Sequence, residues 1–135
     1  FGEKDFQQLQ IIRKLVAKHK IPVNIIPCEI YRETSGLAMS SRNERLSEKA
    51  RKESKLIHKI RLQAKEKFIL KSAPEVTKFV EREFKKHKNF TLEYFDIADE
   101  GTLLTCKRKL KSKNYRGFIA VFIENIRLID NISLK

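Results

Sequence analysis

Residues 5–27 read DFQQLQIIRKLVAKHKIPVNIIP, and two consecutive patterns in this stretch decide the fold class. From Asp5, which can cap a helix, to about Lys20, apolar residues recur every three or four positions, which predicts an amphipathic helix. After Pro22, the run Val23–Ile26 is apolar, rich in β-branched residues and closed by a second proline, so it predicts a short buried strand. A helix followed by a buried strand is half of a β-α-β unit and predicts an α/β fold with a parallel sheet. The apolar positions of the helix are Phe6, Leu9, Ile12, Leu15 and Val16.

The strand that would precede this helix is missing from the sequence. The chain starts on Phe1, with no initiator methionine and no charged-then-apolar leader of the kind that forms a signal peptide. We therefore expect the 135 residues to be a fragment of a longer protein, interrupted inside an α/β domain.

Residues 47–135 carry the pattern of a second, smaller module. Ser47 and Ser72 each precede an apolar-periodic stretch and are expected to cap helices, the second through a capping box with Glu75. From residue 92 the period changes to two, which predicts strands over residues 92–97, 117–123 and 126–129, with Glu124-Asn125 as a tight hairpin. Two helices followed by an antiparallel sheet form an α+β module. The helices are expected to bury Leu56, Ile57, Ile60, Ala64, Phe68 and Ile69, then Val76, Phe79, Val80 and Phe84.

Composition excludes several classes of protein. The chain has 30 Lys and Arg against 17 Asp and Glu, a net charge of +13, and 41% of its residues are hydrophobic, which is enough to build a core. No apolar run approaches the roughly 18–20 residues that cross a bilayer. Cys28 and Cys106 lie far apart without CxxC spacing, so they predict neither a disulfide framework nor a zinc site, and no metal ligands are assigned.

Two polar segments carry the pattern of a phosphate-binding site. Gly2-Glu3-Lys4-Asp5 opens a helix, whose free backbone N–H groups and partial positive charge suit an anion, and Gln8 lies one turn further on. In the loop Met39-Ser40-Ser41-Arg42-Asn43, adjacent hydroxyls and a guanidinium can hold phosphate oxygens. Phosphoryl and adenylyl transfer need such donors where negative charge develops.

In this order and separation the motifs FGEKDFQQL (1–9), Arg32-Glu33, GLAMSSRN (36–43) and RLIDN (127–131) closely resemble the pantoate–β-alanine ligase family. The resemblance implies an ATP-dependent ligase that works in two steps. Pantoate attacks the α-phosphate of ATP, with Mg²⁺ assisting, to give pantoyl adenylate and pyrophosphate. The amine of β-alanine then displaces AMP to form pantothenate, and no enzyme side chain becomes a covalent nucleophile.

The resemblance also implies roles for individual residues. Lys4 with Ser40, Ser41 and Arg42 would carry catalysis, and Gln8 would bind pantoate. Tyr31 departs from the small aliphatic residue common in the family, and Glu44-Arg45 departs from the more usual Arg-Tyr. The residues expected to bind ATP are Gly2, Glu3, Lys4, Asp5, Tyr31, Met39, Ser40, Ser41 and Arg42.

The family further implies a division of the chain near Leu46-Ser47. Residues 1–46 would be the carboxy-terminal part of a Rossmann-like, cytidylyltransferase-like nucleotide-binding domain, and residues 47–135 an α+β lid domain. The full-length protein is expected to be a cytoplasmic homodimer that acts on small molecules, not on nucleic acid or membranes. None of the three histidines lies in the family's His-x-Gly-His setting, so the chain alone is expected to be inactive.

A nucleic-acid-binding module is the alternative interpretation. The net charge and the cluster Lys107–Lys113 would supply electrostatic affinity for phosphates. However, no aromatic residues are interleaved with these lysines as stacking platforms, and glutamates alternate with lysines along the helices as on an ordinary solvated face.

Overall fold

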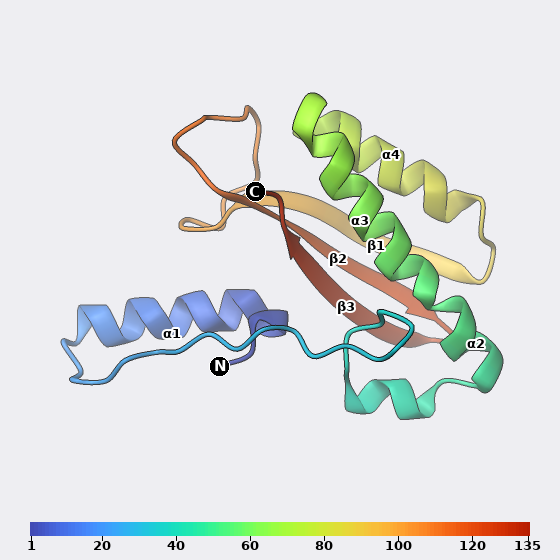
Figure 1. The fold of residues 1–135 in the computed structure, drawn as a ribbon, viewed down its shortest axis with the longest axis horizontal. Coiled ribbons are helices and arrows are strands. Elements are labelled where there is room, and N and C mark those ends of the chain that lie inside the picture. The colour runs from blue at the N-terminus through green and yellow to red at the C-terminus, as the bar shows by residue number, and fades with distance from the viewer.

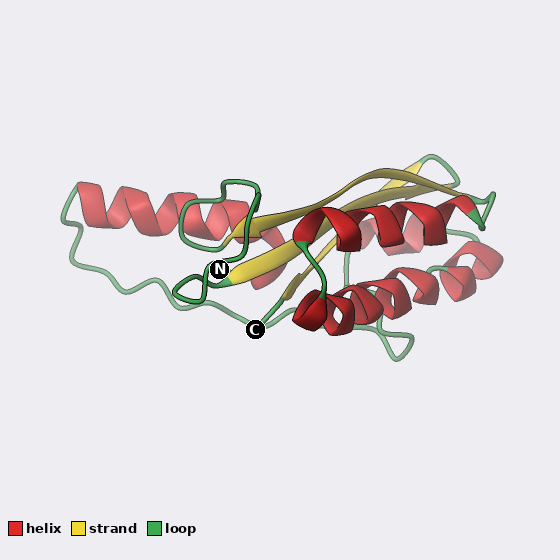
Figure 2. Ribbon diagram, turned by 90° about the horizontal axis from the view of Figure 1, so that it is seen from above, coloured by secondary structure: helices red, strands yellow, loops and turns green.

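A three-stranded sheet forms the centre of the computed structural model, which describes all 135 residues (Figure 1). Two long helices lie against one face of the sheet, and the first helix extends away from one end of it (Figure 2). In chain order the elements are η1 (Glu3–Asp5), α1 (Phe6–Lys18), η2 (Ser41–Arg45), α2 (Glu48–Glu53), α3 (Lys55–Leu70), α4 (Ala73–Lys85), β1 (Phe90–Asp99), β2 (Tyr115–Ile123) and β3 (Ile126–Ser133).

The sheet is antiparallel with the order β1-β2-β3, as the alternating pattern predicts. Strands β2 and β3 are joined by Glu124 and Asn125, whose φ angles of 49° and 61° are those of a two-residue turn that matches the twist of the strands. Glu93 is an extra residue in β1, because Leu92 pairs with Val121 while Tyr94 pairs with the adjacent Ala120. The predicted hairpin and α+β module are confirmed.

The main core lies between the sheet and the helices α3 and α4. Alternate residues of each strand face these helices, including Phe95, Ile119, Val121 and Leu128. Helix α4 begins with the predicted capping box, in which Ser72 and Glu75 satisfy each other's backbone N–H groups, and its apolar side is buried. The helical residues of this core are Ala50, Ile57, Ile60, Ala64, Phe68, Ala73, Val76, Val80 and Phe84.

The opposite face of the sheet is met by the start of α1. Phe6 packs against Phe118, with ring centroids 6.0 Å apart, and the guanidinium of Arg116 lies 4.0 Å from the centre of the Phe6 ring. Beyond this contact α1 extends away from the sheet, and the following chain runs back beside it (Figure 1). Phe6 and Leu9 are buried, whereas Leu15 on the distal half of α1 is exposed.

Four local predictions are wrong. Val23–Ile26 is not a buried strand: Val23 and Ile26 are 53% and 70% exposed. Its one backbone hydrogen bond to another segment is donated by the Phe1 amino group to the Ile26 carbonyl, and the single parallel bridge, Gly2 to Cys28, lies just beyond the stretch. A β-branched run becomes a buried strand only beside further strands, which residues 1–135 do not provide here. The α/β class is nonetheless confirmed, although the parallel contact within these residues is limited to the single bridge between Gly2 and Cys28.

The other three errors concern helices. Asp5 makes no capping hydrogen bond, because the 3-10 turn of residues 3–5 runs directly into α1. Ile69 is exposed at the end of α3, where it has passed beyond the sheet-facing side of the helix. The single helix expected after Ser47 is divided at Ser54 into α2 and α3.

None of the helices combines the length and the apolar character that a membrane span requires.

The packing of α4 gives a stability prediction. Val80 is fully buried, so Val80→Ala removes two methyl groups from a close-packed region and should lower the unfolding free energy by about 2 kcal/mol. Leu70→Ala is the matched control, because Leu70 is 88% exposed and its truncation should change stability by less than about 0.5 kcal/mol. Urea unfolding followed by circular dichroism measures both. Equal losses in the two variants would contradict the described core.

Candidate functional site

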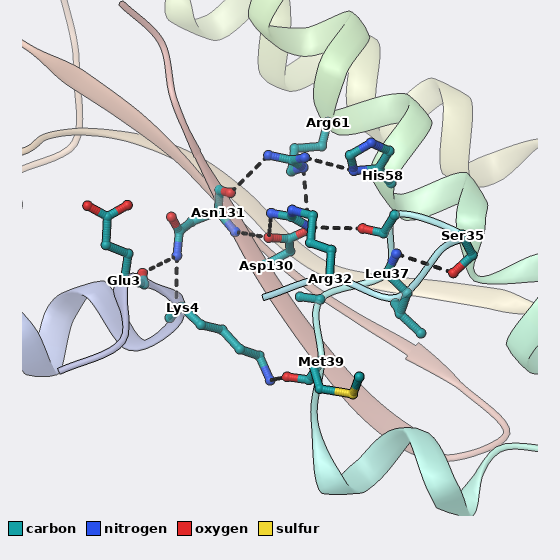
Figure 3. Close-up of polar contacts among 12 residues, drawn as sticks. Glu3, Lys4, Arg32, Ser35, Leu37, Met39, His58, Arg61, Asp130 and Asn131 are labelled. Atoms are coloured by element: carbon teal, nitrogen blue, oxygen red, sulfur yellow. Dashed lines mark hydrogen bonds and ion pairs between the residues drawn. The ribbon is translucent and has the colours of Figure 1, made fainter. Parts of the chain in front are cut away.

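The first component of the site is the turn at the start of α1. The extended backbone of Gly2 is followed by the 3-10 turn Glu3–Asp5, and the Glu3 N–H donates to the carbonyl of Cys28 over 2.8 Å. This bond ties the turn to the segment that follows α1. The Lys4 side chain leaves the turn half-buried and points toward the loop of residues 39–42 (Figure 3).

The second component is that loop. The Met39 N–H donates to the Tyr31 carbonyl over 2.9 Å, which holds Met39 against the preceding chain. Ser40 has extended backbone and caps η2, its hydroxyl accepting from the Arg42 N–H over 3.2 Å. Ser40 is therefore fixed at the start of a helical turn, with Ser41 and Arg42 exposed on its first residues.

The two components meet at Lys4. Its Nζ donates to the Met39 carbonyl over 3.1 Å, and Nη1 of Arg42 donates to the Arg127 carbonyl over 3.3 Å. Neither cation has a carboxylate oxygen within ion-pair distance. Burial holds the pKa of Lys4 below its ordinary value, and the charge of Arg42 adds to the effect, while Asp5 and Asp130 oppose it. A bound anion would favour the charged form of Lys4, so the pair is suited to phosphate.

A cavity of about 280 Å³ opens beside Lys4. It is bounded by the first turn of α1, including Gln8, and by the exposed side of β2 and β3, including Phe118, Arg127 and Ile129. The Gln8 amide has no hydrogen-bonding partner in the chain and is free to contact a ligand in this cavity. A polar ligand here would lie between the cation pair and an apolar wall.

The structure therefore brings together most of the residues singled out in the sequence. Lys4, Met39, Ser40 and Arg42 form one continuous group, and Asp5 and Gln8 share the cavity with Lys4. The Tyr31 side chain is 75% exposed and contributes its backbone carbonyl instead. The carboxylate of Glu3 is turned toward Arg116, 3.8 Å away. No group of three His, Cys, Asp or Glu side chains gathers anywhere in the 135 residues.

At Gly2 the fold would accept a residue with a side chain. Its φ of −72° suits any residue, and a Cβ added there would meet no atom within 4 Å. Gly36 is the opposite case: its φ is +86°, and a Cβ would lie 2.4 Å from the imidazole of His58. Thus Gly36 is required by packing, whereas residues 1–135 place no such requirement on position 2.

Sequence reasoning missed the buried polar network behind the site. The carboxylate of Asp130 accepts two hydrogen bonds from the Arg32 fork, at 2.7 and 2.8 Å, and lies 3.3 Å from Nε of Arg61 (Figure 3). Asn131 donates from its amide to the carbonyls of both Glu3 and Lys4, each at 2.9 Å. The motif RLIDN marked these positions, but only the fold reveals what they contact.

Comparison with known proteins gives a consistent result. The sequence profile of the family described as Pantoate-beta-alanine ligase matches residues 1–133. Over all 135 residues the chain is 60% identical to the pantothenate synthetase of Flavobacterium psychrophilum and 54% identical to that of Christiangramia forsetii. It covers 48% of each of these proteins, so the chain spans about half the length of the curated relatives that it matches.

Solved structures give the same match. The crystal structure of pantothenate synthetase from Thermus thermophilus superimposes with a TM-score of 0.88 at 32% identity, covering 99% of this chain and 48% of that one. Pantoate-beta-alanine ligase from Francisella tularensis, described as complexed with beta-gamma ATP and beta-alanine, superimposes with a TM-score of 0.61 at 28% identity, covering 98% of this chain and 42% of that one.

The two glycines give a paired prediction. Gly36→Ala forces a left-handed backbone on an L-residue and drives its methyl group into His58, so the unfolding free energy should fall by about 2 kcal/mol or more. Gly2→Ala should change it by less than about 0.5 kcal/mol, because the position is open. Denaturant unfolding of both variants measures the difference. A Gly36→Ala variant as stable as the parent would disprove the described packing of this loop on His58.

His58 gives a pH prediction. Burial, then the charges of Arg61 and Arg32, lower its pKa, and its Nδ1 accepts from Nη2 of Arg61 over 2.7 Å, which requires an unprotonated ring nitrogen. As pH falls, the imidazole of His58 therefore gains a proton in the unfolded chain at a higher pH than in the folded chain. The unfolding free energy should consequently fall as pH drops below about 6.5. His58→Gln should reduce the slope of stability against pH in this range, measured by urea titrations from pH 7.5 to 5. His19→Gln, which removes an exposed imidazole, is the control, and an equal reduction there would refute the assignment.

Proposed function

The chain belongs to the pantoate–β-alanine ligase family, and on that premise we propose that, within a protein of its relatives' length, it forms half of an ATP-dependent ligase that joins pantoate to β-alanine. The observation that carries the proposal is that Lys4 bonds to the loop that carries Arg42, and that both of these cations lack a carboxylate partner. Adenylate formation concentrates negative charge on phosphate oxygens, and fixed cations without partners stabilise that charge.

In the first step, a carboxylate oxygen of pantoate attacks the α-phosphorus of ATP. The new O–P bond gives pantoyl adenylate as the bond to pyrophosphate breaks. Lys4 and Arg42 would hold the phosphate oxygens, and the hydroxyls of Ser40 and Ser41 would add neutral donors. Gln8 would bind pantoate through its free amide, at the edge of the cavity that it shares with Lys4.

In the second step, the amine of β-alanine attacks the acyl carbon of the adenylate, the C–O bond to AMP breaks, and the amine loses a proton. The chain supplies position and charge in both steps and no covalent nucleophile. We propose that Gly2, Glu3, Asp5, Met39 and the backbone of Tyr31 line the nucleotide; the open surroundings of Gly2 support a close approach of ligand to its backbone.

The residues present do not form a Mg²⁺ site of their own. Near the cation pair Asp5 is a single exposed carboxylate, and Asp130 is already occupied by two arginines. Mg²⁺ commonly binds substrate phosphates with few protein ligands. We therefore propose that any Mg²⁺ enters with ATP, and we assign it no step.

The remaining proposals concern the longer protein. Residues 1–46 would complete a Rossmann-like nucleotide-binding domain, and residues 47–135 would form the lid over it. The longer protein would be a cytoplasmic homodimer acting on small molecules. The isolated 135 residues would not catalyse the reaction, because the HIGH-like histidine motif of the family is not among them.

A chimera tests the function. This chain replaces the matching half of the 60% identical Flavobacterium psychrophilum protein, and pantoate-dependent exchange of pyrophosphate into ATP is measured. We expect exchange by the chimera, a loss of about 100-fold for Lys4→Ala, and little change for Lys14→Ala, an exposed lysine of α1.

Two further samples serve as controls. The unmodified F. psychrophilum protein is the positive control, and the isolated chain should show no exchange. Full exchange by Lys4→Ala would disprove the role of Lys4, and exchange by the isolated chain would disprove its dependence on the other half.

A further inference from the structure

Asp130 and Asn131 are neighbours in β3, and their side chains lie on opposite faces of the sheet because the side-chain period of a strand is two. We propose that they are a positioning pair for the nucleotide site: Asn131 holds the Glu3–Lys4 turn, while Asp130 holds the loop that leads to Met39. The inference rests on the proposed function and names residues that would set where its cations lie.

The Asn131 arm contacts the backbone of the turn directly. The side chain is 2% exposed, and its Nδ2 donates to two successive carbonyls, those of Glu3 and Lys4. Its Oδ1 accepts from Nη1 of Arg116 over 2.6 Å, so the donor and acceptor ends of the amide are both used and its orientation is fixed. Arg116 also lies over the Phe6 ring, which locks the first turn of α1 to the same strand.

The Asp130 arm acts through Arg32. The planar guanidinium of Arg32 donates two hydrogen bonds to the carboxylate and a third, from Nη1, to the Gly36 carbonyl at 2.9 Å. Residue 32 pairs with Ala38 across this short loop, and Met39 follows immediately. Fixing Arg32 thus fixes the position of the Met39 carbonyl, the acceptor of the Lys4 ammonium.

The two arms therefore converge on one bond, that between Lys4 and Met39, from opposite sides of the strand (Figure 3). Asp130 and Asn131 are almost completely buried, and their side chains are engaged by protein groups, so we assign them a role through Arg32 and the Glu3–Lys4 turn even though Asp130 borders the cavity. Their expected effect is on the position of Lys4 and the following loop. A displacement of about 1 Å at a reacting group can cost 100-fold in rate.

The test uses the chimera and its exchange assay. Asn131→Asp keeps the shape but places an oxygen against two carbonyl oxygens, and exchange should fall about 10- to 100-fold. In a Lys4→Ala background the same substitution should have at most about a twofold further effect, because residues that act as a unit are not additive. Arg32→Lys, which keeps the charge and loses the fork, should lower exchange and show the same non-additivity.

Val80→Ala is the stability control, since it weakens the core remote from the site. It should lower the melting temperature and keep the exchange rate within about twofold of the parent. If Asn131→Asp does not fold, Asn131→Ser takes its place, because it removes both amide N–H donors without adding charge.

The outcomes separate the hypotheses. Exchange by the Asn131 variant equal to the parent's, or losses that multiply with that of Lys4→Ala, would overturn the positioning role and leave the ligase function intact. An unmodified chimera that folds but shows no pantoate-dependent exchange, while the F. psychrophilum protein does, would overturn the proposed function itself.

Discussion

The buried carboxylate of Asp130 is the interaction on which the arrangement of the chain depends. It lies in the middle of β3 and contacts arginines from two other parts of the chain, Arg32 before η2 and Arg61 in α3. Burying a carboxylate is costly, and the cost is offset only when its oxygens are hydrogen-bonded with good geometry. Here the Arg32 fork and the Asn131 N–H supply those bonds. The demand for such geometry restricts how the loop, the helix and the strand can be placed relative to one another.

The parts of the fold that the sequence predicts correctly depend on short-range chemistry. The capping box of α4 needs only Ser72 and Glu75, and the hairpin needs two residues that accept positive φ. The prediction of a strand at Val23–Ile26 was wrong because a strand forms only beside neighbouring strands. The local sequence pattern does not show whether such neighbours are present. The division at Ser54 likewise depends on packing: its side chain is fully buried and bonds back to the Ala50 carbonyl.

The same distinction applies to the site. Lys4 and the Met39–Arg42 segment could be named from motif and resemblance, and the structure joins them through a single hydrogen bond. The residues behind them could not be found in this way, because Asp130 and Asn131 contact groups about 100 positions away in the chain or more. A polar pair between Ile129 and Ile132, inside a strand, is the only local sign that such contacts exist, since buried polar groups require partners.

The net charge of +13 attracts anions but does not define a binding site. What distinguishes one cation from another is the group that each contacts. Arg51 and Arg127 are neutralised by glutamates, and Arg116 by Glu100. Lys4 and Arg42 instead donate to carbonyl oxygens, which orient a cation while leaving its charge uncompensated. Orientation without neutralisation is the condition for stabilising charge that appears only during a reaction. Under the proposed function, a strand that fixes the backbone around such cations would affect catalysis through the position of those cations.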